Sequence, residues 1–554
     1  MHDFFYDVLI IGGGATGLRS ALEASSQKDL KCAVLSKVHP LRSQTCMAQG
    51  GMNAALDNNH GKSGDSIDKH IKDTIVSGSY LSDQNAVELF CESAPECVIE
   101  LEHLGMIFSR NSQGKIAQRP FGGGISPRTC YSRDYTGHNL LSTLYSNCLK
   151  QNVKFHDECF VNALIVENKR IQGLIMTDLK TGDISTIATK ALIIATGGVT
   201  ALFANNVNST TTTGDGIALA YINGANLKDM EFIQFHPTSL ANKGILISEA
   251  ARGEGGHLIN SKRERFVDEL TSRDVVAQAI QNEIDKGRGI NDHVFLDIRH
   301  LGRSKISDKL PQIQKITMDF AGLDCTSTLI PVKPAAHYLM GGIDCNEQCE
   351  TSIEGLFAAG ECACISIHGA NRLGGNSLME TVVFGKIAGE NAKKFALNTK
   401  KSEIKKDHKK TVKQEISLLK SKNKGFKPAE LRKELNDIMN HTAGIFRSNS
   451  SLNDGLQKLE VIEEKNKNLY VDDKEDILNY ELLNAFELRN MLKLGKCILT
   501  GAKTREESRG AHFRKDFPTR NDPLFLKHTL FKYNKNQNPG ISYKEVDIKN
   551  HYPQ

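Results

Sequence analysis

Asp7-Val-Leu-Ile-Ile-Gly-Gly-Gly-Ala-Thr-Gly17 is the stretch of sequence that decides the fold. A continuous apolar run passes directly into three glycines and then into a helical stretch over residues 18–25. Gly12 permits the tight turn, Gly14 lets a pyrophosphate approach the backbone, and Gly17 lets the helix pack close to the strand. The stretch therefore predicts the strand, turn and helix that open a Rossmann-like α/β dinucleotide-binding domain.

Further along the chain, apolar runs again end at a turn. The run from Cys32 ends at Ser36-Lys37, where an NAD site would carry an acid for the ribose hydroxyls. Residues 191–198 and 355–361 are short apolar runs that turn at glycine, and the last ends in Glu361. Taken alone, each of these runs is equally well explained as an ordinary strand and turn without a bound cofactor. Together they predict one large dinucleotide, FAD, whose ribose or ribityl hydroxyls meet Glu361.

Length, charge and cysteine spacing exclude several classes of protein. A chain of 554 residues allows roughly three or four domains, and a net charge of +5 is too small for a dedicated nucleic-acid binder. The thirteen cysteines include no Cys-x-x-Cys pair, which argues against a zinc or iron–sulfur site within this chain. No signal peptide or membrane span is recognisable at the N-terminus, so a cytoplasmic protein is expected.

Motifs spread over nearly the whole chain resemble the flavoprotein subunit of the fumarate reductase and succinate dehydrogenase family, and fumarate reductase most closely. They are the glycine turn at 12–17, Leu41-Arg-Ser-Gln-Thr45 with Ala48-Gln-Gly-Gly51, Phe235-His-Pro-Thr238, Arg252-Gly-Glu-Gly-Gly256, His337-Tyr-Leu-Met-Gly-Gly342, the run 368–377 and Glu507-Ser-Arg-Gly-Ala-His512. The resemblance implies an FAD domain split into residues 1–230 and 336–397 by an α+β capping domain over 231–335. A helical domain at 398–505 and a short C-terminal tail at 506–554 are expected to follow.

The helical domain is also expected from the sequence itself. Apolar residues recur at spacings of three, four or their multiples, as amphipathic helices require. They are Ile404, Val412, Ile416 and Leu419, then Leu431, Leu435, Ile438 and Met439, then Leu482, Leu483, Phe486 and Leu494. The lysine-rich stretch 400–424 is interpreted as the solvated face of such a helix in preference to a membrane-binding surface.

The resemblance carries functional roles onto matching positions. It implies substrate binding by His236, Ser248, His337 and Arg372, proton donation by Arg273, and a proton relay through Glu249 and Arg252. No metal ligand is expected. The implied FAD-binding positions are Gly12, Gly14, Ala15, Gly17, Ser36, Lys37, Ser43, Gln44, Thr45, Gly50, Gly51, Thr196, Gly197, Asp215, Glu361, Asn376, Ser377 and Leu378.

The chemistry of fumarate reduction fits these residue types. Fumarate is a small dianion, and an arginine fork binds a carboxylate through two parallel hydrogen bonds. Arginine is a weak acid, so its side-chain chemistry alone would not predict that Arg273 donates a proton. That role is implied only by the resemblance to the family. Considered singly, His236 is a satisfied packed side chain, and Arg273 with Asp274 is an ion pair at a helix start.

Gln44 is the informative departure from the family pattern. Respiratory members carry a histidine there that is joined covalently to the flavin, and an amide side chain cannot form that bond. The substitution predicts non-covalent FAD. Losing the link is expected to lower the flavin potential and to favour fumarate reduction over succinate oxidation.

Several alternatives stay open at this point. They are succinate dehydrogenase working in the oxidative direction, L-aspartate oxidase on the same scaffold, and a non-catalytic flavin-binding assembly subunit. The resemblance implies an iron–sulfur partner subunit, with either a membrane-anchoring quinone-reactive subunit or a soluble thiol-oxidising partner. It thereby implies a place at the inner face of the cytoplasmic membrane.

Overall fold

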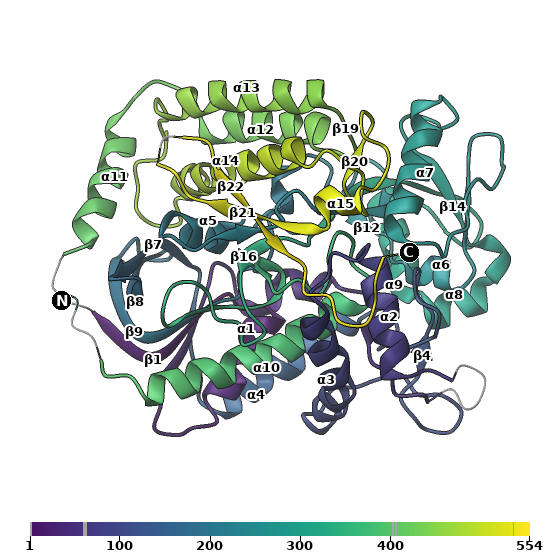
Figure 1. The fold of residues 1–554 in the computed structure, drawn as a ribbon, viewed down its shortest axis with the longest axis horizontal. Coiled ribbons are helices and arrows are strands. Elements are labelled where there is room, and N and C mark those ends of the chain that lie inside the picture. Colours follow the sequence, from purple (N-terminus) through teal and green to yellow (C-terminus); the bar gives the residue numbers. More distant parts are fainter. Residues whose placement is uncertain (1–2, 59–63, 402–403, 405–406, 536, 554) are drawn as a thin grey trace.

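A seven-stranded sheet lies at the centre of the computed structural model, which describes residues 3–58, 64–401, 404, 407–535 and 537–553 (Figure 1). Its order is β6-β2-β1-β9-β8-β7, and β17 pairs with β9. The strands are β1 (Phe4–Ile11), β2 (Cys32–Ser36), β6 (Lys154–Asp157), β7 (Cys159–Glu167), β8 (Arg170–Asp178), β9 (Ile184–Ile194) and β17 (Leu356–Ala358). The mixed α/β fold class predicted from the sequence is confirmed.

The parallel strands of this sheet all end at one edge. Ile11 lies opposite both Leu35 and Ile194, and Ile194 lies opposite Ala358. In an open α/β sheet, ligands bind beyond the carboxyl ends of such strands. The glycine turns that follow β1 and β9, and the turn before Glu361, therefore meet in space although they are far apart in the sequence.

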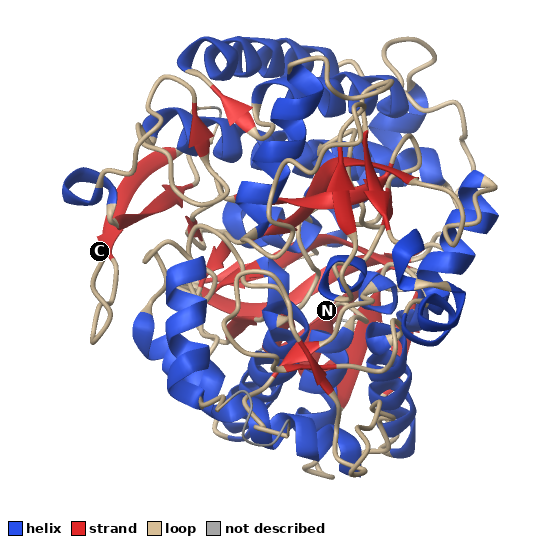
Figure 2. Cartoon of the chain, turned by 90° about the vertical axis from the view of Figure 1, so that its right-hand side faces the viewer, coloured by secondary structure: helices blue, strands red, loops and turns tan. Residues whose placement is uncertain are grey.

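Helices cover the central sheet, and Figure 2 shows the strands inside with helices around them. Helix α1 (Ala15–Ala24) packs on α10 (Asn376–Leu397), the long helix at the bottom of Figure 1. The other elements of this part are α2 (Ile67–Ser77), α3 (Gln84–His103), α4 (Thr136–Lys150), α5 (Asp215–Ile222), and the short strands β3 (Met52–Asn53), β4 (Gln118–Arg119) and β5 (Thr129–Cys130).

A second sheet, in the order β12-β11-β15-β14-β13, lies within the segment predicted as the cap. Its elements are β11 (Ile233–Leu240), β12 (Ile245–Leu246), α6 (Ala250–Gly253), β13 (His257–Ile259), α7 (Arg273–Asp285), β14 (Val294–Asp297), α8 (Arg303–Lys309), α9 (Pro311–Ala321) and β15 (Ile330–Leu339). A separate hydrophobic cluster fills this part. Strand β15 runs through the predicted boundary at residue 335, and the boundaries themselves stay predictions.

The segment 398–505 is mostly helical, as its periodicity predicts. It contains α11 (Lys409–Ser421), α12 (Pro428–Thr442), α13 (Asn449–Asn466) and α14 (Tyr480–Thr504). The assignment of Ile404 to the first of these helices is wrong, because α11 begins only at Lys409; Ile404 is nevertheless buried with Val412 and Ile416. Four positions of the lysine-rich stretch, 402–403 and 405–406, lie outside the described residues.

The C-terminal segment is held by two strands of its own. Strands β21 (Lys527–Lys532) and β22 (Gly540–Glu545) complete a five-stranded sheet with β10 (Leu227–Lys228), β16 (Gly342–Asp344) and β18 (Ala363–Cys364). Ahead of them, β20 (Phe513–Arg514) pairs with β19 (Phe446–Arg447), and α15 (Asp522–Phe525) follows. The segment predicted as a tail is thereby tied to the predicted FAD domain and to the helical segment.

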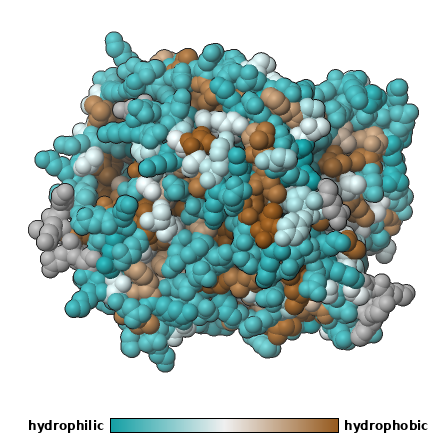
Figure 3. Space-filling view, in the orientation of Figure 1, coloured by the Kyte–Doolittle hydropathy of each residue, from teal (hydrophilic) through white to brown (hydrophobic). Residues whose placement is uncertain are grey.

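Polar side chains cover most of the face seen in Figure 3, where apolar residues show through in separate patches. Over the described part of the chain, no helix is both long enough and apolar enough to cross a bilayer. All thirteen cysteines are free thiols, and all but Cys46 are buried.

Candidate functional site

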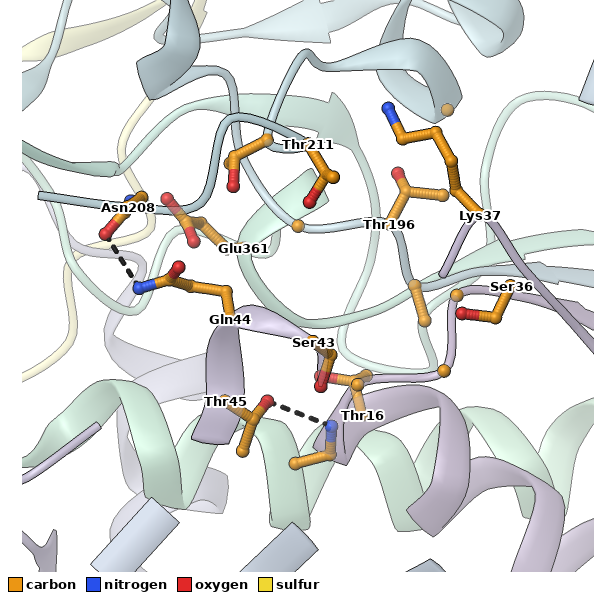
Figure 4. A pocket seen from close by; sticks show the side chains of 18 of the residues that line it. Thr16, Ser36, Lys37, Ser43, Gln44, Thr45, Thr196, Asn208, Thr211 and Glu361 are labelled. Carbon is orange, nitrogen blue, oxygen red and sulfur yellow. Dashed lines mark hydrogen bonds between the residues drawn. The ribbon is translucent and has the colours of Figure 1, made fainter. Parts of the chain in front are cut away.

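A deep cavity opens at the carboxyl ends of the parallel strands, where the ligands of open α/β sheets bind. Of the predicted FAD-binding positions it is lined by Gly12, Gly14, Ala15, Ser36, Lys37, Ser43, Gln44, Thr45, Thr196, Gly197, Asp215, Glu361, Ser377 and Leu378. Figure 4 shows 18 of the lining residues, and the ten that it labels come from segments widely separated in the sequence.

The glycines of the first turn are required by close backbone contacts. Gly12 has a φ of 117°, and a Cβ there would lie 2.1 Å from the carbonyl oxygen of Ala195. A Cβ on Gly17 would lie 1.9 Å from the carbonyl oxygen of Gly12. At Gly14 the nearest atom would be Thr45 Oγ1 at 3.4 Å, so this position is packed less tightly and borders the cavity.

Buried polar atoms on the cavity wall are left without protein partners. Ser43 Oγ and Thr196 Oγ1 have no hydrogen-bond partner among the described residues. An unpaired buried hydroxyl costs free energy, so each favours a ligand with polar atoms at this wall. The hydroxyls and the glycine turn together fit the phosphates and sugars of a dinucleotide.

Lys37 and Asp215, both predicted to bind the cofactor, bond to each other. Lys37 Nζ lies 2.8 Å from Asp215 Oδ2 and 2.6 Å from Glu487 Oε1 on α14. Glu361 accepts a hydrogen bond from the backbone N–H of Leu339 at 3.0 Å, and burial raises its pKa to about 7. A hydroxyl-bearing ligand would find an acceptor at Glu361 in either protonation state.

Gln44 lies at the cavity wall with its amide fully engaged by the protein. Its Nε2 donates to Asn208 Oδ1 at 3.0 Å, and its Oε1 accepts from the backbone N–H of Ser209 at 2.7 Å (Figure 4). The adjacent Thr45 Oγ1 accepts from the N–H of Ala15 at 3.1 Å. Gln44 therefore stabilises the loop that carries Asn208 and offers no nucleophile.

Four predicted FAD-binding positions do not line the cavity. Gly17 lies beneath the turn, and a Cβ on Gly50 would touch the Phe121 ring at 2.6 Å. Gly51 has a φ of 136° beside the backbone of Cys130. The side-chain oxygen of Asn376 accepts from Asn53 Nδ2 at 2.8 Å within a fully buried amide network. These contacts support the loops around the cavity, and a direct role in cofactor binding stays a prediction.

Next to the cavity, the three predicted arginines surround one carboxylate. Arg273 donates from Nε and Nη2 to Glu249 Oε2 at 2.8 and 2.6 Å. Arg252 Nη2 lies 3.6 Å from Glu249 Oε1, which also accepts from the N–H of Gly122 at 2.9 Å. All of these groups are buried. The structure thus brings together the predicted proton donor and both members of the predicted relay.

The remaining substrate positions lie around this cluster. The rings of His236 and His337 are 5.1 Å apart and perpendicular, and His337 also lines the cavity. The guanidinium of Arg372 lies 4.5 Å above the Tyr338 ring. Ser248 is buried, and its Oγ accepts the N–H of Ala250 at 3.2 Å. Arg372 Nε and His337 Nδ1 have no hydrogen-bond partner among the described residues.

The electrostatics of this cluster favour a bound anion. Burial and the charge of Arg273 lower the pKa of Arg372 to about 9. Burial and the neighbouring arginines also lower the pKa values of His236 and His337 well below their ordinary range, so both rings are neutral. Three buried guanidiniums, of which Arg273 pairs directly with Glu249, therefore favour a negatively charged ligand, although Glu269 and Glu361 also act on Arg252 and Arg372.

Several residues of the site were missed by the sequence analysis. Phe121 packs against Gly50 and Gly374, Gln234 bonds to Arg273, and the backbone carbonyl of Glu269 accepts from Arg252 at 2.6 Å. Gln234 directly precedes the Phe235-His-Pro-Thr238 motif but was assigned no role. Phe121 and Glu269 lie in segments without a recognisable local pattern, so only the tertiary structure brings them to the site.

Comparisons with known proteins agree with this geometry. Residues 7–378 match the FAD binding domain family, and residues 432–554 match the family described as fumarate reductase flavoprotein C-term. The fumarate reductase flavoprotein subunit of Mycobacterium tuberculosis (strain CDC 1551 / Oshkosh) is 39% identical over 98% of this chain and 97% of its own length. The 8-methylmenaquinol:fumarate reductase flavoprotein subunit of Wolinella succinogenes is 41% identical over 98% and 91%.

The chain is also similar to a succinate dehydrogenase subunit and to a solved structure of a fumarate reductase. The succinate dehydrogenase flavoprotein subunit of Rickettsia bellii is 38% identical over 98% of this chain and 95% of that protein. A solved structure of E. coli quinol fumarate reductase superposes with a TM-score of 0.96 at 36% identity and covers 100% of this chain and 99% of that one.

The fold and the site define an FAD-dependent oxidoreductase. Within that class, the chain belongs to the family of fumarate reductase and succinate dehydrogenase flavoprotein subunits. The family predicted from the sequence motifs is confirmed.

Proposed function

We propose that this chain binds FAD non-covalently and reduces fumarate to succinate, with succinate oxidation as the reverse reaction. The observation that carries the proposal is the group of three buried guanidiniums, those of Arg252, Arg273 and Arg372, beside the dinucleotide cavity. Such a group favours an anionic substrate such as the dianion fumarate over a neutral one, which would leave the buried charges unpaired.

In this mechanism the arginines and histidines of the chain hold the dianion. Arg372 binds one carboxylate with its fork, and the neutral imidazoles of His236 and His337 lie where they can hydrogen-bond to the substrate. When bound, FAD supplies a hydride to one alkene carbon. Arg273 delivers the proton to the other carbon, because its guanidinium is held by Glu249 on one side and by Gln234 Oε1, 3.1 Å from Nη1, on the other.

In the proposed relay, Glu249 takes up a proton from the Arg252 side only in passing and gives it up at once to the deprotonated guanidine of Arg273. Its pKa is lowered, because the charges of Arg273 and Arg252 and the hydrogen bonds from Arg273 and Gly122 outweigh the effect of burial. The carboxylate therefore stays ionised and accepts from both sides. The path continues through Arg252, whose other end, Nη1, donates to the carbonyl of Glu269.

Non-covalent binding follows from the chemistry of Gln44 and from its engaged amide. We also propose that electrons arrive from an iron–sulfur partner subunit, fed by a membrane-anchored quinone-reactive subunit or a soluble thiol-oxidising partner at the inner face of the cytoplasmic membrane. The relatives support this by name, since each is called a subunit and one a menaquinol:fumarate reductase.

The test uses the purified flavoprotein under anaerobic conditions. Acid precipitation is expected to release all FAD into the supernatant. After chemical reduction of the flavin, fumarate is expected to restore the oxidised visible spectrum. Arg273→Gln should slow that step by at least about 10³-fold with full FAD content, because the proton donor is lost.

Arg303→Gln is the matched control, because Arg303 lies in the same part of the chain with its side chain 73% exposed. Reoxidation of Arg273→Gln at the wild-type rate would refute the mechanism, and flavin retained on the precipitated peptide would refute non-covalent binding. Formation of peroxide and iminoaspartate from L-aspartate, without reoxidation by fumarate, would instead support L-aspartate oxidase.

A further inference from the structure

A buried amide, Gln234, connects the two arginines that lie on opposite sides of the site. Its Oε1 accepts from Arg273 Nη1 at 3.1 Å. Its Nε2 donates at 2.8 Å to the backbone carbonyl of Arg372 and at 2.8 Å to Asn371 Oδ1. Gln234 is fully buried at the start of β11. The oxygen of this amide accepts one hydrogen bond and the nitrogen donates two, so the orientation of the amide group is fixed.

A second amide closes this path into a ring. Asn371 Nδ2 donates at 2.9 Å to Asp274 Oδ1, and Asp274 directly follows Arg273 at the start of α7. The ring therefore runs from Arg273 through Gln234 and Asn371 to Asp274 and returns along the peptide bond. Asn371 is also buried, so water does not compete for its bond to Gln234, whereas its bond to Asp274 is only partly buried.

The ring joins segments that have separate supports. Helix α7 packs on β11 and β15, whereas the loop with Arg372 is held from elsewhere. In that loop, the N–H of Ala370 donates to the Gly78 carbonyl at 2.9 Å, and its carbonyl accepts from the N–H of Ala511 at 2.9 Å. The two amides thus connect the proton-donating side of the site to the carboxylate-binding side.

We infer that Gln234 and Asn371 are positioning residues that fix Arg273 relative to Arg372. This inference rests on the proposed function and deepens it, because neither amide is assigned to substrate contact. A neutral amide suits the task. A carboxylate in place of Gln234 would hold Arg273 but lose both bonds to the Arg372 loop and would remove part of the positive charge that the dianion requires.

The consequence is a selective loss of rate. A displacement of about 1 Å between the proton donor and a clamped substrate can cost ~10²-fold in rate. The residues that bind the dianion remain in Gln234→Met, so binding should change less than the chemical step. We expect kcat to fall about 10–100-fold and KM to change less than about threefold.

The experiment compares the wild-type holoprotein with Gln234→Met, Asn371→Ala and the double variant. Each is assayed for reoxidation of the reduced flavin by fumarate, for FAD content, and for fumarate binding to the oxidised protein by perturbation of the flavin spectrum. Because both substitutions open the same ring, the double variant should be about as slow as the slower single variant. Gln234→Glu should in addition weaken fumarate binding, by about tenfold.

Asn260→Ala is the matched control. Asn260 is a buried amide of the same part of the chain whose Nδ2 donates to Glu264 and Glu283, outside the ring. Its variant should keep the wild-type kcat. The inference is overturned if Gln234→Met retains wild-type kcat, if its loss of rate is fully explained by a loss of FAD, or if the losses of the two single variants multiply in the double variant. If wild-type protein fails to respond to fumarate, the proposed function fails and the inference fails with it.

Discussion

Gly14 and Gly17 are three residues apart in one turn, yet they tolerate a methyl group very differently. At Gly17 a Cβ would lie 1.9 Å from the Gly12 carbonyl, a distance at which backbone has to move. At Gly14 the closest atom lies at 3.4 Å, which is nearly an ordinary contact. The first glycine is needed for a ligand to approach, and the second for the fold itself.

We therefore predict different losses for the two alanine variants. Gly17→Ala should lower the unfolding temperature of the protein or prevent folding, because α1 can no longer pack on β1. Gly14→Ala should keep the unfolding temperature of the FAD-free protein and weaken FAD binding at least about tenfold. Thermal unfolding and FAD titration by flavin fluorescence measure the two effects, and equal destabilisation by both substitutions would contradict the prediction.

For single residues, the sequence predicts which chemical groups the site contains better than it predicts which side chains bond to each other. The residue types of Arg252, Arg273 and Arg372 are recognisable in their motifs, and the structure gathers all three around Glu249. The partner of a side chain is harder to predict, because Gln234 and Asn371 are far apart in the sequence and meet only in the folded chain. Asn376 gives a second example. It lies within a recognisable motif, but the motif does not reveal that the side-chain oxygen of Asn376 accepts a hydrogen bond from Asn53.

Among the elements, helix α9 has its N-terminus capped from outside its own part of the chain. Asp134, directly before α4, accepts from the N–H of Gln312 at 2.7 Å and of Ile313 at 3.3 Å. Asp134 is fully buried. It thus satisfies N–H groups that have no partner within the helix and connects the segment predicted as the FAD domain to the segment predicted as the cap.

Replacing this cap should destabilise the contact between the two segments. Asp134→Ala is expected to lower the free energy of unfolding by about 1–2 kcal/mol, and Asp134→Asn should restore part of it because an amide oxygen also accepts. Ser448→Ala is the control, because Ser448 caps α13 within its own segment. Limited proteolysis should cleave near residues 299–311 faster in Asp134→Ala than in the control; equal cleavage would contradict the prediction.

Helices whose apolar residues recur at a regular spacing were predicted from the sequence, whereas short strands without such a spacing were not. The helices of 398–505 repeat apolar residues at three and four, whereas the short strands β10, β16 and β18 have only two or three residues each. Such strands exist because they pair with one another and, at β10, with β21, which no local pattern indicates. The beginning of α11 was misplaced for a related reason: Ile404 is buried by contacts with distant residues before any helical turn begins.

At the scale of the whole molecule, one buried histidine connects three distant segments. His528 on β21 lies 2.6 Å from Asp229 and 3.2 Å from Asp83, and Lys228 lies 4.0 Å from Asp83. Although burial opposes its charge, the two carboxylates raise the pKa of His528 to about 9. The charged imidazole holds the C-terminal strands to the rest of the protein.

This raised pKa predicts the direction of a pH dependence. The stabilisation is fully present below the unfolded-state pKa of about 6.5 and is lost as the pH rises through about 9, with up to about 3 kcal/mol at stake. Urea unfolding between pH 6.5 and 9.5 should show this loss in the wild type. His528→Gln should be less stable at pH 6.5 and show a flatter profile; an unchanged slope would contradict the prediction.

The pairing of β21 with β10 also has a consequence during synthesis of the protein. Phe531 and Leu227, which face each other in this pair, are separated by most of the second half of the chain. At ~5–20 residues per second the ribosome needs about 15–60 s to produce the roughly 300 residues between them. Throughout that interval the edge of β10 has no partner from β21, so the nascent chain is most exposed to aggregation just before its last strands are released.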